Sequence, residues 1–327
     1  MSRLIHIVLV FVSYFWRHIQ NWQINSSDEM LDSENFIQWM YLFLGNIRHT
    51  LDMRAQLPKY NIPNVAYSDF ANKKNSDTLF VFGSGPTIND LRPCDFEYIH
   101  KHDSLGFNYF LVHDFVPDFY CYETPANYAL YDFFCSVLNE KQEYDSVPLV
   151  IQFQHFEKRG FDISKVRTDI RPVYFVVPYR YRTISETRLR KLLYLRKWLT
   201  ILSPFTLNSV IHHGGSISYI VTMAYAMGYQ TIILLGVDMY NTEYFFTELP
   251  DNSYKKDLVD LFERIRAGRL VFTHNDPQFT KKFGELPPDI FLRLFNEIFL
   301  IPDGVKLYVG SEKSRLATFL PVFSFPG

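Results

Sequence analysis

Seven short apolar runs, each bounded by turn residues, recur along the chain from residue 78 onward. Several are continuously apolar rather than alternating, which is typical of strands that are buried on both faces of a parallel sheet. The sequence therefore predicts a mainly parallel sheet with strands at 78–83, 104–107, 117–122, 147–153, 172–178, 230–235 and 305–309.

Segments with helical apolar periodicity separate these runs. Alternating strands and helices are typical of a doubly wound, modified Rossmann-like α/β fold. Residues 1–75 show helical periodicity without a strand signal, so we expect a helical extension, 1–75, followed by an α/β domain, 76–327. The expected helices of that domain are 126–139, 184–202, 216–227, 254–267 and 287–300.

The first predicted strand ends in a glycine turn within the stretch LFVFGSGPTINDL. In doubly wound sheets, ligands bind beyond the carboxyl ends of the strands. Ile88 stands where the dinucleotide fingerprint needs a third glycine, and no Walker lysine follows, so neither motif is present. The turn at Gly83, Ser84 and Gly85 would place backbone N–H groups at a helix start, where a phosphate or a ribose edge can bind. A tight turn without a ligand is the alternative.

Polar residues follow the next two predicted strands. Asn108 comes after the second strand and can both donate and accept hydrogen bonds to a nucleobase or a sugar. Glu123 comes after the third, where a carboxylate can accept hydrogen bonds from ligand hydroxyls. A helix cap and a solvated loop acid, respectively, are the alternative interpretations of these two residues.

The stretch 212–240, HHGGSISYIVTMAYAMGYQTIILLGVDMY, contains a second helix start with glycines. Gly215 and Ser216 open an almost wholly apolar and therefore buried helix, and Ser216 is the expected N-cap. The strand that follows this helix brings Asp238 to the same end of the sheet. Both glycine turns therefore point to one ligand region.

Histidines and tyrosines nearby suggest chemistry without a metal. His212 and His213 are adjacent, so both cannot face one ion from regular structure, and we expect no metal site. Tyr240 and Tyr244 could hydrogen-bond a leaving phosphate, although packing is the alternative. His274 has polar neighbours and could serve as a general base near pH 7, although a structural role is the alternative.

Composition narrows the class of protein. The formal net charge of -2 does not suggest a nucleic-acid binder. Aromatic residues make up 17% of the chain, which suits sugar and nucleotide sites, membrane interfaces and ordinary core alike. Cys94, Cys121 and Cys135 have no metal-like spacing, so we expect reduced thiols.

The N-terminal apolar run, 4–16, is shorter than the ~20 residues that span a bilayer as a helix. No small-residue cleavage site follows it, which disfavours a signal peptide. We expect an uncleaved helix on the cytoplasmic face of the inner membrane, with packing on the protein body as the alternative.

A second segment, YRYRTISETRLRKLLYLRKWL, predicts a basic amphipathic helix. Three uses remain open for it: binding an anionic glycan acceptor, contacting anionic lipid, or forming a solvated face. Its cationic residues are Arg180, Arg182, Arg188, Arg190, Lys191, Arg196 and Lys197.

Together these motifs resemble the bacterial sialyltransferases of glycosyltransferase family 42. The resemblance rests on LFVFGSGPTINDL, LGFNYF, GGSISYIVTMAYAMGYQTIILLGVDMYN, a downstream histidine and KLYVGSEKSRLATFLP, in the family's order across about 78–322. That family has a modified Rossmann-type fold with a lid over a CMP-sugar, and it transfers a nonulosonic acid with inversion and without an essential metal. The resemblance implies a lid here around 239–285 and no essential cofactor.

The resemblance also implies residue roles. Tyr240 and Tyr244 would hold the departing phosphate, and His274 would take the proton from the acceptor hydroxyl. The nucleotide-sugar contacts would come from Gly83, Ser84, Gly85, Asn108, Gly215 and Ser216. The chain departs from the family at Glu123, where asparagine is usual, and at His213, where arginine is usual.

The expected function is therefore an inverting transfer of a sialic-acid-like sugar from a CMP-sugar to a hydroxyl of a surface glycan or glycolipid. One alternative is another CMP-linked keto-acid donor, such as Kdo, pseudaminic acid or legionaminic acid. The other is a non-catalytic sialyltransferase-like module that binds nucleotide or glycan. Homo-oligomerisation is left open, and no nucleic-acid partner is expected.

Overall fold

The computed structural model describes residues 45–46, 48–65, 70, 73–125, 127–202, 210–239, 243–266 and 285–326. The chain divides into two compact units, Met1–Gly45 and Asn46–Gly327, and the fold below is that of the second. The predicted membrane helix, 4–16, lies outside the described residues. Among the residues that are described, no helix is both long and apolar enough to cross a membrane.

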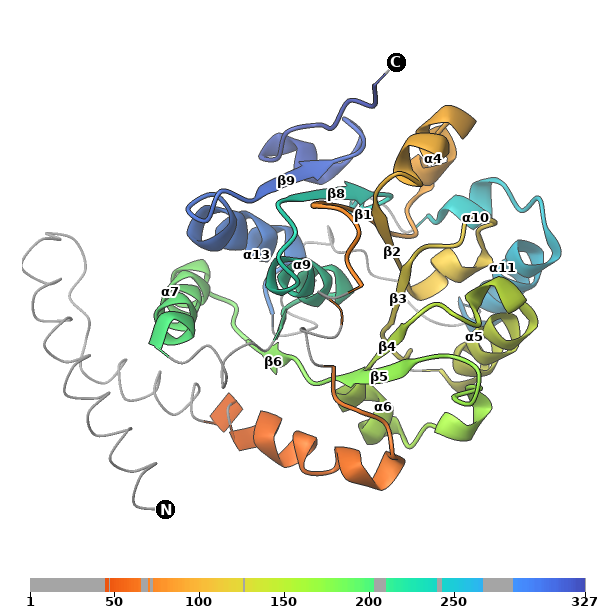
Figure 1. The fold of residues 1–327 in the computed structure, drawn as a ribbon, viewed down its shortest axis with the longest axis horizontal. Coiled ribbons are helices and arrows are strands. Elements are labelled where there is room, and N and C mark those ends of the chain that lie inside the picture. Colours follow the sequence, from red (N-terminus) through yellow and green to blue (C-terminus); the bar gives the residue numbers. More distant parts are fainter. Residues whose placement is uncertain are drawn as a thin grey trace, which may run out of the picture. The chain divides into compact units, whose positions relative to one another are not determined.

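A seven-stranded sheet forms the centre of this unit, in the order β5-β4-β3-β2-β1-β8-β9 (Figure 1). Every pairing between neighbouring strands is parallel, and all seven predicted strands are present, which confirms the α/β fold class. The strands are β1 (Thr78–Phe82), β2 (Asp103–Phe107), β3 (Phe119–Tyr122), β4 (Leu149–Gln152), β5 (Val173–Val176), β8 (Thr231–Leu235) and β9 (Lys306–Val309).

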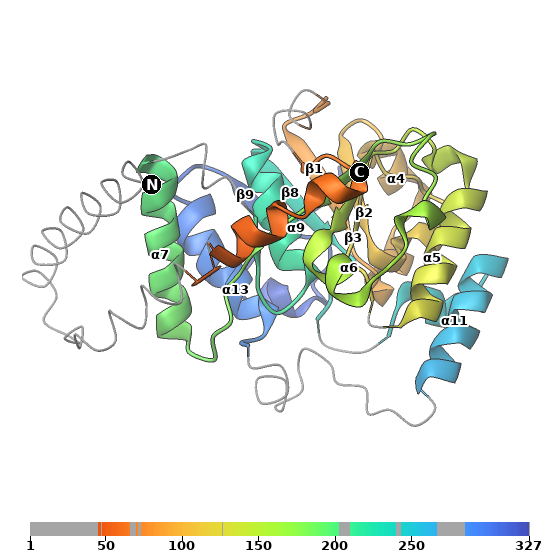
Figure 2. The same cartoon turned by 90° about the horizontal axis from the view of Figure 1, so that it is seen from below.

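Helices cover both faces of the sheet, which explains why its strands are apolar throughout. Figure 1 shows α4, α5, α10 and α11 on one side and α7, α9 and α13 on the other, and Figure 2 separates α5 and α11 from α7 and α13 in the same way. The five predicted helices are present as α5 (Tyr128–Glu140), α7 (Glu186–Leu202), α9 (Ser216–Ala226), α11 (Ser253–Arg266) and α13 (Pro288–Phe295).

Shorter elements were not predicted, because two turns or fewer leave little periodicity in a sequence. The short α-helices are α4 (Pro93–Ile99), α6 (Phe153–Arg159) and α10 (Phe245–Glu248). A π-helical turn, η6 (Asn296–Leu300), continues α13. The 3-10 segments are η1 (Leu57–Tyr60), η2 (Pro86–Asp90), η3 (Asn108–Val112), η4 (Gln142–Tyr144), η5 (Ile163–Lys165) and η7 (Arg315–Thr318).

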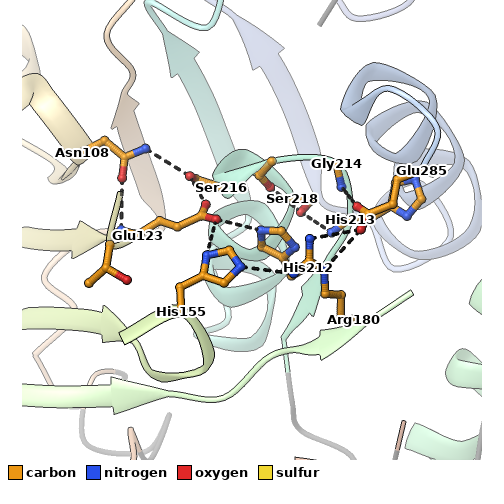
Figure 3. A network of polar contacts seen from close by, with 12 residues as sticks. Asn108, Glu123, His155, Arg180, His212, His213, Gly214, Ser216, Ser218 and Glu285 are labelled. Carbon is orange, nitrogen blue, oxygen red and sulfur yellow. Dashed lines mark hydrogen bonds and ion pairs between the residues drawn. The ribbon is translucent and has the colours of Figure 1, made fainter. Parts of the chain in front are cut away.

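A second sheet of two short parallel strands, β6 (Tyr179–Arg180) and β7 (Ile211–His212), lies beside α9. Strands of two residues are too short to show alternation, so the sequence did not predict them. This small sheet matters because its ends, Arg180 and His212, carry polar side chains toward the carboxyl ends of the main strands (Figure 3).

Aromatic rings account for much of the core on the α5 side of the sheet. The rings of Phe82 and Phe110 stack with centroids 4.5 Å apart, and those of Tyr122 and Phe134 stack at 3.4 Å. All four side chains are buried. These four aromatic residues therefore belong to the hydrophobic core, which is the ordinary interpretation of an aromatic-rich sequence.

Both edges of the main sheet carry an extra segment of chain. Along β5, the Val65 N–H donates to the Phe175 carbonyl and the Phe175 N–H donates to the Pro63 carbonyl. Along β9, the Val309 N–H donates to the Pro321 carbonyl and the Phe323 N–H donates to the Val309 carbonyl. Residues 46–65 therefore belong to the α/β unit, which begins before the predicted boundary at 76.

The basic segment is only partly the predicted amphipathic helix. Helix α7 starts at Glu186, so Arg180 and Arg182 lie ahead of it. Within α7, Lys197 pairs with Asp303 at 2.9 Å, and the buried Arg196 guanidinium lies 4.6 Å from the centre of the Tyr179 ring. These two cations stabilise packing within the unit rather than forming an open basic face.

Candidate functional site

The glycine turn after β1 packs directly against the end of β8. The N–H groups of Gly83 and Gly85 donate to the carbonyls of Leu235 and Gly236, at 2.7 and 2.8 Å. A Cβ atom on Gly83 would lie 2.4 Å from the Gly236 oxygen, so only glycine permits this approach. These two N–H groups already donate to backbone carbonyls and are not available to a ligand. Ser84, which is half-buried, is the residue of the turn left to contact a nucleotide, and that contact stays a prediction.

Asp238, which follows β8, is hydrogen-bonded to Thr87, which follows β1. Its carboxylate accepts the Thr87 N–H at 3.1 Å and the Thr87 hydroxyl at 2.6 Å. Burial raises the pKa of Asp238, and the two hydrogen bonds from Thr87 oppose that rise. Asp238 thus faces Thr87 from a buried position, and its predicted ligand contact is untested.

Three predicted residues meet in one hydrogen-bonded group, although they come from distant segments (Figure 3). The Asn108 side-chain N–H donates to the Ser216 hydroxyl at 3.0 Å, across 108 residues of sequence. The Ser216 hydroxyl donates to Glu123 Oε2, and the Glu123 backbone N–H donates to Asn108 Oδ1 at 3.1 Å. Strands β2 and β3 and the start of α9 thus deliver Asn108, Glu123 and Ser216 to one place.

Asn108 is held in a backbone conformation that few residues adopt. Its φ is +53°, in the left-handed region, where asparagine is tolerated better than most side chains. The Tyr120 hydroxyl fixes this conformation, because it donates to the Asn108 carbonyl at 2.5 Å and accepts the Leu111 N–H at 2.7 Å. Unusual backbone of this kind tends to cluster at functional sites.

Two histidines face the other oxygen of Glu123. His155 Nδ1 lies 2.9 Å from Oε1, and His212 Nε2 lies 3.3 Å from the same atom. Burial alone would raise the pKa of Glu123, but its interactions with His212 and His155 outweigh burial and hold that pKa well below the usual range. Glu123 is therefore a carboxylate at neutral pH.

Hydrogen bonding fixes the protonation of His155. Burial lowers the pKa of His155 despite the nearby carboxylate, so the ring is neutral at pH 7. Arg180 can only donate, and its Nη1 lies 3.1 Å from His155 Nε2, which must therefore be the acceptor. The proton of His155 accordingly sits on Nδ1, facing Glu123.

Glu285 extends the network toward the start of α9. Its buried carboxylate accepts from Arg180 Nε at 3.2 Å and pairs with Arg182 Nε at 3.2 Å through Oε1. Its other oxygen accepts the Gly214 N–H at 2.9 Å. Glu285 thus ties the small β6–β7 sheet to the glycine turn that precedes Ser216.

The start of α9 differs from the prediction in one respect. The N-cap is Gly215, and the Ser216 side chain makes no capping bond, so the prediction that Ser216 caps the helix is wrong. The Ser216 hydroxyl is committed to Glu123 and Asn108 instead. The Gly215 carbonyl accepts the Ser218 hydroxyl at 2.7 Å, which closes the first turn.

The adjacent histidines do point in different directions, as predicted. His212 faces Glu123, whereas His213 Nδ1 contacts the Tyr181 carbonyl at 2.5 Å. Among the described residues, no group of three histidine, cysteine or acidic side chains is placed to hold a metal ion. Independence from metals stays a prediction.

The three predicted catalytic residues are not all described. Tyr240 and His274 lie outside the described residues, so their roles stay predictions. Tyr244 is half-buried and stacks on Phe246, with ring centroids 4.9 Å apart. The next residue, Phe245, donates its N–H to the Ser84 carbonyl at 3.0 Å, which places Tyr244 close to the glycine turn.

Sequence reasoning missed His155, Arg180 and Glu285. His155 was detectable, because it follows β4 by three residues and the carboxyl ends of the other strands had already supplied candidates. Arg180 was assigned to the basic helix, and the two-residue strand that carries it gave no signal. Glu285 becomes significant only through contacts with residues more than 70 positions away.

Comparison with known proteins gives distant structural neighbours. No protein-family model matches the sequence, and no curated protein matches it. Monofunctional alpha-2,3-sialyltransferase Cst-I from Campylobacter jejuni is 16% identical, with 80% of this chain and 83% of that chain covered and a TM-score of 0.39. Sialyltransferase CstII from Campylobacter jejuni, in complex with cytidine-5'-monophosphate, is 17% identical, with 75% and 84% covered and a TM-score of 0.37.

Proposed function

We propose that this protein is an inverting glycosyltransferase that moves a nonulosonic acid from a CMP-sugar to a hydroxyl of a surface glycan or glycolipid. The observation that carries the proposal is the hydrogen-bonded group of Asn108, Glu123 and Ser216. It lies at the carboxyl ends of parallel strands, where ligands of doubly wound proteins bind. The sequence resemblance to family 42 supports CMP-sugar as the ligand.

Transfer from a CMP-sugar requires the protein to stabilise the leaving group and to deprotonate the acceptor. CMP must leave as an anion, so hydrogen-bond donors must stabilise the departing phosphate, and one removed donor of this kind weakens catalysis by about 3 kcal/mol. We assign this task to Tyr240 and Tyr244. The acceptor hydroxyl must lose a proton, and a positioned base contributes roughly 10² to 10⁴ in rate. We assign this task to His274.

The hydrogen-bonded group of Asn108, Glu123 and Ser216 has a different role from the two tyrosines and His274, which is to bind the donor. Asn108 is clamped in its left-handed conformation and Ser216 is held by two partners, so both are preorganised before any ligand arrives. Asn108 and Ser216 would therefore hold the nucleotide, while Tyr240, Tyr244 and His274 act on the departing phosphate and the acceptor hydroxyl. We also propose that the acceptor is a surface glycan or glycolipid and that the protein is attached to the cytoplasmic face of the inner membrane.

The test is a thermal-shift panel of CMP, CDP, UDP, GDP and NAD on the full chain. We expect CMP to raise the melting temperature most, and we expect Ser216→Ala to reduce that rise. Ser136→Ala is the matched control, because Ser136 is exposed on α5 and, within the part of the chain that the structure describes, its hydroxyl bonds only to Glu140, at 2.8 Å. Stabilisation by UDP or NAD with CMP inert would refute the donor assignment, and CMP release from a CMP-sugar would establish turnover.

A further inference from the structure

The hydrogen-bonding capacity within the Asn108–Glu123–Ser216 group can be counted, because the direction of each of its three internal bonds is fixed. Glu123 Oε1 lies between two histidines, 2.9 Å from His155 Nδ1 and 3.3 Å from His212 Nε2. Oε2 accepts from the Ser216 hydroxyl and has one lone pair remaining. Counted over the described residues, Glu123 Oε2 thus offers one further acceptor position.

The other two side chains each offer one more position. The Ser216 oxygen donates its proton to Glu123 and accepts from Asn108, so it keeps one lone pair. The Asn108 amide nitrogen gives one proton to Ser216 and keeps one. Its amide orientation is fixed, because Asn108 Oδ1 accepts the Glu123 N–H at 3.1 Å.

The three residues that carry these positions are partly exposed, and the positions lie close together. Asn108 and Ser216 are half-buried, and the Glu123 side chain is 17% exposed. The three atoms are linked by consecutive hydrogen bonds, so two acceptors and one donor lie within the span of a small ligand group. A single hydroxyl cannot satisfy all of them, since it has only one proton to donate.

Two neighbouring hydroxyls satisfy them fully. One hydroxyl donates to Glu123 Oε2 and the other to the Ser216 oxygen, while a hydroxyl oxygen accepts the remaining Asn108 proton. Resting on the proposed function, we propose that Glu123, Ser216 and Asn108 together bind the cis-diol of the nucleotide ribose and so select ribonucleotides over deoxyribonucleotides.

The charge of Glu123 strengthens this selection. Hydrogen bonds to a charged partner are roughly twice as strong as neutral ones, so a ribose hydroxyl gains more from a carboxylate than from an amide. His155 and His212 flank the carboxylate, and Arg180 keeps His155 in the tautomer whose N–H is on the side of Glu123. These three residues position Glu123 and need not touch the ligand.

A diol could also come from the transferred sugar, and the experiment separates the two sources. Dissociation constants are measured by calorimetry on the full chain with CMP, 2′-deoxy-CMP, 3′-deoxy-CMP, UMP, 2′-deoxy-UMP and the intact CMP-sugar. We expect loss of either ribose hydroxyl to weaken binding by about tenfold to a hundredfold. Glu123→Gln should reduce this preference by about tenfold, whereas Glu297→Gln, which removes a carboxylate paired with Arg190, should not.

Each outcome decides the matter. Equal binding of CMP and both deoxy analogues overturns the ribose assignment, as does a contribution of Glu123 that appears only with the CMP-sugar. If UMP rather than CMP binds and its 2′-hydroxyl matters in a Glu123-dependent way, the diol assignment stands and the proposed donor fails. Absence of binding by every ribonucleotide overturns both. Ser216→Ala provides a second variant should Glu123→Gln not fold.

Discussion

His113 gives a quantitative test of how this fold responds to pH. Its ring is half-buried and stacks on Phe110 and Phe96, with centroids 4.9 and 5.4 Å apart. His113 Nδ1 accepts the Phe115 N–H at 2.9 Å, so that nitrogen must be unprotonated for the bond to exist. Protonating the folded protein at His113 therefore breaks a hydrogen bond and places a charge among aromatic rings.

The size of the effect follows from the pKa. Burial, assisted by the positive charge of Lys255, lowers the pKa of His113 to about 4, whereas an unfolded histidine titrates near 6.5. Because the folded value is the lower one, the unfolded chain binds the proton first as the pH falls. The stability linked to His113 is complete above about pH 6.5 and is lost between there and about pH 4. At pH 5 the loss relative to pH 8 is about 2 kcal/mol.

Urea unfolding of the full chain, followed by circular dichroism at pH 8, 7, 6 and 5, measures this loss. His113→Asn keeps an acceptor for the Phe115 N–H and cannot titrate, so its free energy of unfolding should fall by about 2 kcal/mol less than that of the wild type between pH 8 and pH 5. Other buried histidines contribute equally to both proteins. His100→Asn, at an exposed position, should follow the wild type. Parallel pH profiles for wild type and His113→Asn would refute the reasoning.

Three further substitutions test the packing around the site. Gly85→Ala would place a Cβ atom 2.3 Å from Asp238 Oδ2 and should lower the unfolding free energy by about 1–3 kcal/mol; an unchanged melting temperature would contradict that close approach. Asp103→Asn weakens an acceptor for the Tyr229 hydroxyl, at 2.8 Å, and for the Asn75 N–H, and should destabilise by about 1–3 kcal/mol in urea unfolding. Phe110→Ala removes a fully buried ring and should destabilise by about 3–5 kcal/mol, with a loss below 1 kcal/mol counting against the stacked core.

The strands were predictable because burial on both faces makes them continuously apolar. β1 and β8 read as TLFVF and TIILL, and in each all but the first residue are buried. The elements that could not be predicted owe their structure to distant partners. The two-residue strands β6 and β7 pair with each other across about 30 residues of sequence and have no pattern of their own.

The candidate site divides in the same way. Asn108, Glu123 and Ser216 were predicted because each follows a strand or opens a helix, and such positions converge in a parallel sheet. What sequence could not supply was the pairing itself: Glu123 with His155 and His212 rather than with solvent. Gly83 and Gly85 form a turn after β1, as predicted, and the structure gives this turn a packing reason, which is contact with the end of β8; their nucleotide contact stays a prediction.

The segments that run along β5 and β9 have a consequence for solubility. Unpaired strand edges offer backbone N–H and C=O groups to other chains and so promote edge-to-edge aggregation. Here 63–65 pairs with the outer strand β5 and 321–323 pairs with the outer strand β9, so residues from opposite ends of the unit cover both edges of the sheet. A truncated protein that lacked both segments would expose both edge strands of the sheet. Variants made for expression should therefore retain 46–65 and 319–326.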